Sequence, residues 1–201
     1  MKRKMKRIIT LSLIAIVAIS CIGQEKKENY NSKAIEMNNK AVELMQKLKN
    51  DSALILFDKA IELDRTYYLP HANKVGIYIN RNDFDKALLE CEKSLDLKPD
   101  YAEGWALTGM LYDVKGENKK ALEYYQKSID LFDTKISDPD KKNNIKSNRL
   151  NRAMSLVLIG QEKEGKQELS QLKSEYPDMK IIDEFLKWSK KDYLNQVTHK
   201  N

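Results

Sequence analysis

The sequence predicts an all-α protein assembled from repeated helical hairpins. Only seven glycines and four prolines occur among 201 residues, while charged residues make up 33% and hydrophobic residues 41%. This composition is typical of helices that have one solvated face and one buried face. The more specific observation is that the pattern of residues recurs at a fixed interval along the chain.

The interval is 34 residues. The stretches FDKAIELDRTY (57–67), CEKSLDLKPDY (91–101) and YQKSIDLFDTK (125–135) align at this constant shift. A lysine, two aliphatic residues and an alanine then coincide in all three copies. The coinciding positions are Lys59, Lys93 and Lys127; Ile61, Leu95 and Ile129; Leu63, Leu97 and Leu131; and Ala53, Ala87 and Ala121. Several coincidences at one shift indicate an internal repeat.

Each repeat has the pattern of two helices joined by a turn. In the third copy, Trp105, Gly109 and Tyr112 recur at helical spacing and form one stripe. Gly116 interrupts the pattern, and a second stripe follows over residues 121–129. Two short amphipathic helices around a glycine predict a helical hairpin. The small residues suit points where two helices cross closely.

These hairpins resemble the tetratricopeptide repeat (TPR), a 34-residue unit with a W-x2-L-G-x2-Y…A-x3-F…A…P pattern. The third unit matches best, although it has Thr108 where leucine is usual and Asp133 where proline is usual. The fourth is weakest, with Gly165 where alanine is expected. The resemblance implies a right-handed superhelical solenoid with a concave groove. The predicted units are 34–67, 68–101, 102–135 and 146–179, with an insertion at 136–145.

Residues 180–201 are predicted to form a C-terminal capping helix and tail. Stacked repeats need such a cap to cover the last exposed face. A membrane-surface helix is the alternative, but Asp183, Glu184 and Asp192 dilute its positive charge. The apolar residues near one face are Ile181, Ile182, Phe185, Leu186 and Leu194, with Trp188 and Tyr193 flanking them.

The N-terminus carries a basic stretch, an apolar stretch and a cysteine. A helix over residues 8–20 rises about 20 Å, which is short of the roughly 30 Å of a bilayer core. Ala18-Ile19-Ser20-Cys21 resembles the end of a bacterial lipoprotein signal peptide, with Ala18 where leucine is usual. The resemblance implies that residues 1–20 are removed, that Cys21 is lipidated, and that 21–33 form a flexible tether. The alternative is an uncleaved N-terminal anchor.

The same resemblance implies a lipid-anchored location in the bacterial cell envelope. The residue after the cysteine is Ile22 rather than aspartate, which favours the outer membrane. The leader also explains the net charge of +6, because residues 1–20 hold five of the 36 basic residues and no acid. The remaining 31 basic residues face 30 acidic ones, a net charge of +1. We therefore expect no nucleic-acid binding.

No group of residues predicts catalysis, a metal site or a cofactor. The chain has two histidines and two cysteines and lacks the spacing of a metal site. His71 follows Leu69-Pro70 at a predicted helix start, where a surface or capping role is expected. Cys91 aligns with Phe57 and Tyr125 and should be buried, which makes its thiol inert. We expect a protein without enzymatic activity.

The predicted function is binding of a protein or peptide. By resemblance, the first helix of each hairpin lines the groove, and its candidate residues are largely apolar with three methionines, which adapt to irregular partners. They predict a site for an amphipathic helix or an extended peptide. The alternative is that some pack between repeats or under the terminal helix. The candidates are Asn38, Val42, Met45, Asn73, Ile79, Met110, Asp113, Met154 and Val157.

A carboxylate clamp of the kind that binds chaperone C-termini is not expected. Of the residues that form it, Asn73 is retained, but Asn38, Val42, Glu103 and Leu107 replace the others. The sequence thus predicts a scaffold for assembly or secretion in the envelope. The alternatives are a binder of a small molecule or glycan, or an accessory subunit of an enzyme, using the same groove.

Overall fold

The computed structural model describes residues 29–138 and 144–198, and the predicted all-α class is confirmed there. The described chain divides into an N-terminal unit that ends at Asp100 and a C-terminal unit that begins at Tyr101. The leader, Cys21, residues 22–28 of the tether and residues 139–143 of the insertion lie outside the described residues.

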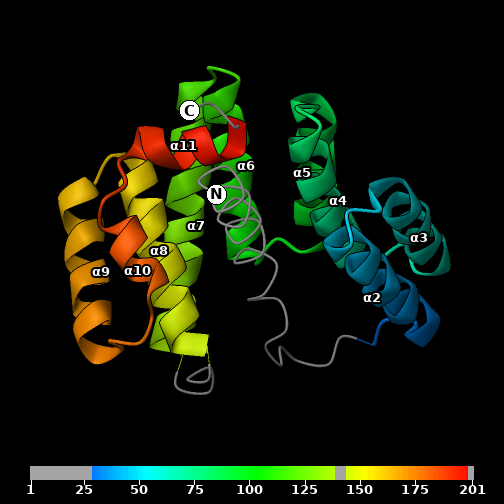
Figure 1. The fold of residues 1–201 in the computed structure, drawn as a ribbon, viewed down its shortest axis with the longest axis horizontal. Coiled ribbons are helices and arrows are strands. Elements are labelled where there is room, and N and C mark those ends of the chain that lie inside the picture. Colours follow the sequence, from blue (N-terminus) through cyan, green and yellow to red (C-terminus); the bar gives the residue numbers. More distant parts are fainter. Residues whose placement is uncertain (1–28, 139–143, 199–201) are drawn as a thin grey trace. The chain divides into compact units, whose positions relative to one another are not determined.

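The N-terminal unit consists of two helical hairpins (Figure 1). Helices α2 (Ser32–Gln46) and α3 (Asn50–Leu63) form the first, and α4 (Leu69–Asn80) and α5 (Phe84–Leu97) form the second. Small residues let these helices approach closely: Ala41 and Ala53 are fully buried beside Phe57 and Ile77. Cys91 is buried on α5, as its alignment with Phe57 predicted.

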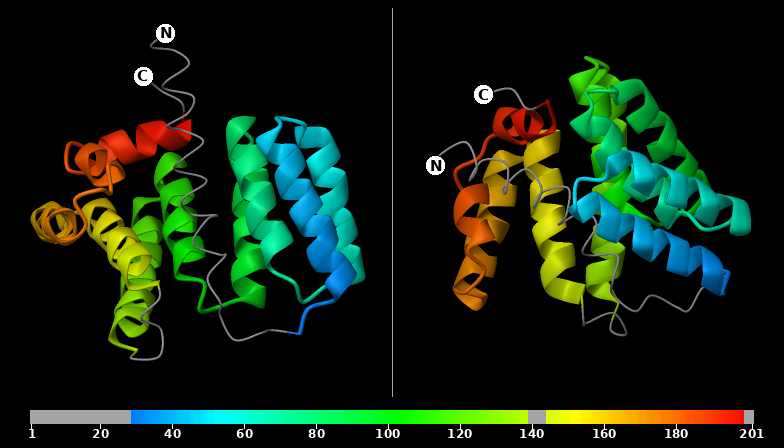
Figure 2. Two further views of the ribbon diagram at one scale, coloured as in Figure 1. Left: turned by 60° about the horizontal axis from the view of Figure 1, so that its bottom comes forward. Right: turned by 45° about the vertical axis from the view of Figure 1, so that its right-hand side comes forward.

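The C-terminal unit holds two further hairpins and two short helices (Figures 1 and 2). The hairpins are α6 (Ala102–Val114) with α7 (Asn118–Ser137), and α8 (Ile145–Ile159) with α9 (Glu162–Glu175). The predicted single capping helix is instead two helices, α10 (Ile181–Phe185) and α11 (Lys190–Thr198).

A left-handed backbone residue recurs at each hairpin turn. Leu48, Asn82 and Gly116 have φ angles of 59°, 56° and 79° and lie 34 residues apart. Gly160, with φ of 104°, follows 44 residues after Gly116, which is the repeat interval plus the ten-residue insertion. The same turn geometry therefore closes all four hairpins, although only two of them supply the glycine that this conformation favours.

Two glycines mark the closest helix crossings of the C-terminal unit. A Cβ added to Gly109 on α6 would lie 2.7 Å from the Tyr125 ring on α7. A Cβ added to Gly165 on α9 would lie 2.6 Å from the backbone oxygen of Ala153 on α8. The missing alanine at position 165 is thus a requirement of this packing, since a methyl group would meet the backbone of the neighbouring helix.

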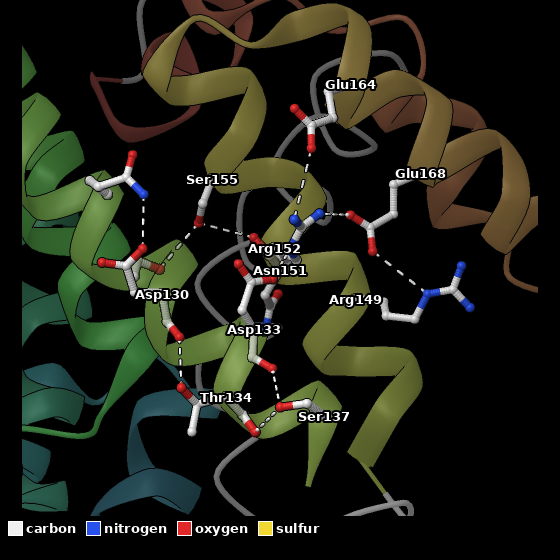
Figure 3. A network of polar contacts seen from close by, with 12 residues as sticks. Asp130, Asp133, Thr134, Ser137, Arg149, Asn151, Arg152, Ser155, Glu164 and Glu168 are labelled. Carbon is white, nitrogen blue, oxygen red and sulfur yellow. Dashed lines mark hydrogen bonds and ion pairs between the residues drawn. The ribbon is translucent and has the colours of Figure 1, made fainter.

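Arginines of α8 join the helices on either side of it (Figure 3). Arg152 is ion-paired with Asp133 of α7, and its Nη1 lies 2.7 Å from Oε2 of Glu168 on α9. Arg149 Nε lies 3.6 Å from Oε1 of the same Glu168. The network links the three helices and adds polar contacts to their apolar packing.

Candidate functional site

The predicted groove residues of the N-terminal unit lie on α2 and α4. Val42, Met45 and Asn73 are half-buried, and Asn38 is 4% exposed. We call these four residues the α2–α4 face. Ile79 is fully buried and therefore has no surface to offer a partner.

Asn73, the one residue that matches the carboxylate-clamp pattern, makes an internal hydrogen bond. Asn73 Nδ2 donates to Asn38 Oδ1 across 2.9 Å, and Asn38 Nδ2 donates in turn to Asn39 Oδ1 across 3.4 Å. The two amides thus join α2 to α4. A partner on this face meets two apolar side chains beside an amide pair.

The predicted groove residues of the C-terminal unit are all withdrawn from solvent. Met110 and Met154 are 5% and 7% exposed, and the Asp113 side chain is 3% exposed. We call these three residues the α6–α8 face. Val157 does not belong to it, because its Cγ2 would lie 2.8 Å from a Cβ on Gly165 and so packs between α8 and α9.

Helix α11 packs against α6 and α8, near the ends of those helices that carry the α6–α8 face (Figures 1 and 2). Lys190 Nζ lies 2.7 Å from Asp113 Oδ2, which also accepts a 2.8 Å hydrogen bond from the Tyr125 hydroxyl. Tyr193 is fully buried and Val197 is 6% exposed. These three α11 residues stand at i, i+3 and i+7, which is one stripe of a helix.

This stripe corrects the prediction for the C-terminal segment. Tyr193 was expected to flank the apolar face, whereas it lies at the centre of the buried stripe. Lys190 was not expected to bind within the chain. The sequence did contain a signal for a new helix start at this point, since Ser189 and Asp192 have the spacing of a capping pair. In the structure, Asp192 Oδ2 accepts a hydrogen bond from Ser189 N across 2.8 Å.

Aromatic rings connect α10 to α11. The ring centroids of Trp188 and Tyr193 are 5.1 Å apart in an edge-to-face arrangement, and those of Phe185 and Tyr193 are 5.7 Å apart. Phe185 is itself fully buried on α10, which packs against α9. The position of Tyr193 is thus set by one ring on α10 and one in the connecting segment.

Two tyrosine hydroxyls are buried in this region, and they differ in whether they find a hydrogen-bond partner. Burial, and then the Asp113 charge, raise the pKa of Tyr125, so this hydroxyl stays protonated and donates to Asp113. Burial also raises the pKa of Tyr193. Among the described residues the Tyr193 hydroxyl has no hydrogen-bond partner. An unsatisfied buried hydroxyl costs about 1–3 kcal/mol.

His71 is buried, contrary to the predicted surface or capping role. Its Nδ1 lies 2.6 Å from Glu90 Oε2, and Lys74 Nζ lies 3.1 Å from Glu90 Oε1 and 2.8 Å from Asp58 Oδ1. Burial alone raises the pKa of Glu90, but the hydrogen bond to His71 and the charge of Lys74 outweigh it and lower the pKa from 4.5 to about 2. The carboxylate is therefore a fixed anion that joins α5 to α4, and Lys74 extends the contact to Asp58 on α3.

The described residues contain neither a candidate metal site nor a candidate membrane span. Nowhere in residues 29–138 and 144–198 do three or more His, Cys, Asp or Glu side chains gather in a way that could hold a metal ion. Within the same ranges, each helix is too short or too polar to cross a membrane.

Comparison with known proteins agrees with a helical-repeat protein of this kind. A family model of the tetratricopeptide repeat matches residues 71–101 and 102–134. Residues 71–134 therefore match two tetratricopeptide repeats, a module suited to protein–protein interaction.

Similar proteins share part of the chain. The heat shock protein sti1 homolog of Schizosaccharomyces pombe is 28% identical over 96 residues, which are 48% of this chain and 16% of that protein. The small glutamine-rich tetratricopeptide repeat-containing protein 2 of Saccharomyces cerevisiae is 23% identical over 100 residues, 50% of this chain and 29% of that protein. The chain thus matches less than a third of the length of either relative.

Among solved structures, PilW, described as a widely conserved type IV pilus biogenesis factor, has a TM-score of 0.59 and 18% identity. The likeness covers 84% of this chain and 71% of PilW. At this level of identity it shows the fold alone.

Proposed function

We propose that this chain is a lipid-anchored, non-enzymatic scaffold of the bacterial cell envelope, with an accessory role in assembly or secretion, that binds a protein partner through the first helices of its repeats. The observation that carries the proposal is the α2–α4 face, where Val42 and Met45 are half-buried apolar residues of α2, one of the helices expected to line the groove. Methionine beside a branched aliphatic residue suits an apolar peptide or helix face.

The lipid anchor rests on the leader and on Cys21. A single acyl chain binds a membrane only marginally, so the two or three chains of a lipoprotein cysteine would give stable attachment. Replacement Cys21→Ala tests this attachment in cells. We expect the variant to lose membrane partitioning and the lipid mass. A variant that keeps both membrane partitioning and the lipid mass would contradict the lipid anchor, but it would not bear on protein binding at the α2–α4 face.

Cross-linking in intact cells tests the protein-binding role. Variants Val42→Glu and Met45→Glu place a charge on the α2–α4 face, where both side chains are already part-exposed. The matched control is Ile55→Glu, because Ile55 is 68% exposed on the second helix of the same hairpin. We expect a discrete protein adduct that the two face variants lose and the control keeps.

Two results would argue against this role. Loss of the adduct in the Ile55→Glu control as well would mean that charge anywhere on the unit disturbs it. Absence of any adduct, together with a melting shift of the purified chain on adding a cell-wall fragment, would instead support a small-molecule or glycan binder.

A further inference from the structure

We propose that the α6–α8 face is a binding site for an amphipathic helix with a basic residue, an aromatic residue three positions later and an aliphatic residue seven positions later, and that α11 is its resident occupant. The proposal rests on the proposed protein-binding role and names the partner chemistry for one half of the chain. Such a partner binds by displacing α11.

The basic residue is required by Asp113. The carboxylate is 3% exposed, and its charged contact is Lys190 Nζ at 2.7 Å. The Tyr125 hydroxyl donates one hydrogen bond but supplies no positive charge. A buried carboxylate left without a cation is strongly unfavourable. Any helix that replaces α11 must therefore bring its own lysine or arginine to this point.

The other two positions are set by apolar burial. Met110 and Met154 project from α6 and α8, the two helices against which α11 packs, and both are nearly inaccessible. Tyr193 and Val197 are the α11 side chains that are buried along the same stripe as Lys190. Methionines adapt their shape to the side chain opposite, so the face accepts other aromatic and aliphatic residues at these positions.

Helix α11 has the features of an occupant that can be displaced. It is nine residues long, which is too short for a stable isolated helix. It also buries the Tyr193 hydroxyl without a hydrogen-bond partner among the described residues. Its advantage is its attachment to the same chain, which gives an effective concentration on the order of millimolar. A free helix whose aromatic residue packs without an unsatisfied hydroxyl can therefore displace α11 if its affinity outweighs this effective concentration.

The test uses a fluorescein-labelled peptide of residues 186–201, LKWSKKDYLNQVTHKN, added to the full chain. Variant Lys190→Glu of the full chain should release α11, because it places a second carboxylate beside Asp113. The matched control is Lys191→Glu, an identical change at the adjacent, exposed lysine. We expect Lys190→Glu to bind the peptide about tenfold more tightly than the control or the wild-type chain, as the loss of a largely buried charge contact implies.

Two substitutions at position 193 of the full chain give opposite signs. Tyr193→Phe keeps the ring and removes the unsatisfied hydroxyl, so α11 holds more tightly and the peptide binds several-fold more weakly. Tyr193→Ala removes the ring, so the peptide binds more tightly. A peptide that itself carries Lys190→Glu should not bind any of these chains.

Equal peptide affinity for the Lys190→Glu and Lys191→Glu chains, or no binding by either, would overturn the inference. Circular dichroism of both variants establishes that their repeats remain helical. The outcome is separable from the proposed function: an in-cell adduct that depends on Val42 and Met45 would still stand if the peptide failed to bind.

Discussion

Glu90 makes the N-terminal unit sensitive to acid. Its folded-state pKa of about 2 lies below its ordinary value of 4.5. The stability it contributes is therefore present above about pH 4.5 and is lost as the pH falls toward 2. The Glu90 side chain is only 6% exposed, so water screens its interactions little. The lowered pKa then corresponds to about 3 kcal/mol of folding stability at neutral pH.

Urea unfolding at a series of pH values between about 6 and 2 measures this effect. We expect Glu90→Gln to be less stable than the wild type near neutral pH and to lose less stability on acidification. Asp96→Asn, an exposed site on the same helix, is the control and should keep the wild-type profile. Parallel profiles for wild type and Glu90→Gln would show that the buried ion pairs do not set the acid response.

Leu48 occupies a position that suits a different residue. Its φ of 59° is left-handed, and its side chain is 67% exposed, so it gains little from packing. The equivalent turn of the next hairpin has Asn82, which tolerates this conformation. We predict that Leu48→Asn raises the free energy of unfolding by about 0.5–1 kcal/mol. Gly116→Leu, which places a leucine at the equivalent turn two repeats later, should lower it.

The packing of α9 on α8 depends on one missing methyl group. Gly165→Ala would raise helix propensity by about 1 kcal/mol if the site were open. Instead, the new Cβ would lie 2.6 Å from a backbone oxygen of α8, so we predict a net loss of about 1–3 kcal/mol. Lys163→Ala, an exposed position of α9, is the control. Thermal unfolding of both variants measures the difference, and a stabilised Gly165→Ala would mean that the helices can separate at little cost.

The helices could be predicted from the sequence because their signals are local. The 34-residue interval, the alanine and glycine positions and the aromatic stripe depend on residues within one hairpin. The two helices of the C-terminal segment were harder to predict, because the apolar residues of 181–194 also fit the spacing of one continuous helix. The break at Ser189 lies between two helices that pack on different partners, α9 for α10 and α6 with α8 for α11.

The candidate site was only partly predictable for a similar reason. Helical periodicity placed Met110 and Met154 on the first helices of their hairpins. It did not indicate that α11, which begins only at Lys190, packs against the same two helices. The burial of His71 likewise depends on Glu90, 19 residues away on the next helix. Single-residue patterns do not report such pairings, since each partner alone has the composition of a surface residue.

For the whole molecule, the distribution of charge decides which partners are excluded. The chain without residues 1–20 carries a net charge of +1, with acidic and basic residues nearly in balance. Phosphate contacts require concentrated positive charge, so we predict no retention of this fragment on duplex DNA at about 50 mM salt. A gel-shift titration checks it. Retention that weakens steeply with added salt would show that a basic surface exists despite the balance.

The rings around Tyr193 give the chain its own optical signal. The sequence has two tryptophans, and Trp188 is part-buried with its ring edge-on to Tyr193, while Trp105 lies on α6. With Trp105 changed to Phe, the emission and near-ultraviolet dichroism of Trp188 report from the start of α11 alone. Release of that helix would shift the emission to longer wavelength and abolish the dichroism. The timing of each opening could then be followed by stopped-flow mixing, without attaching a dye.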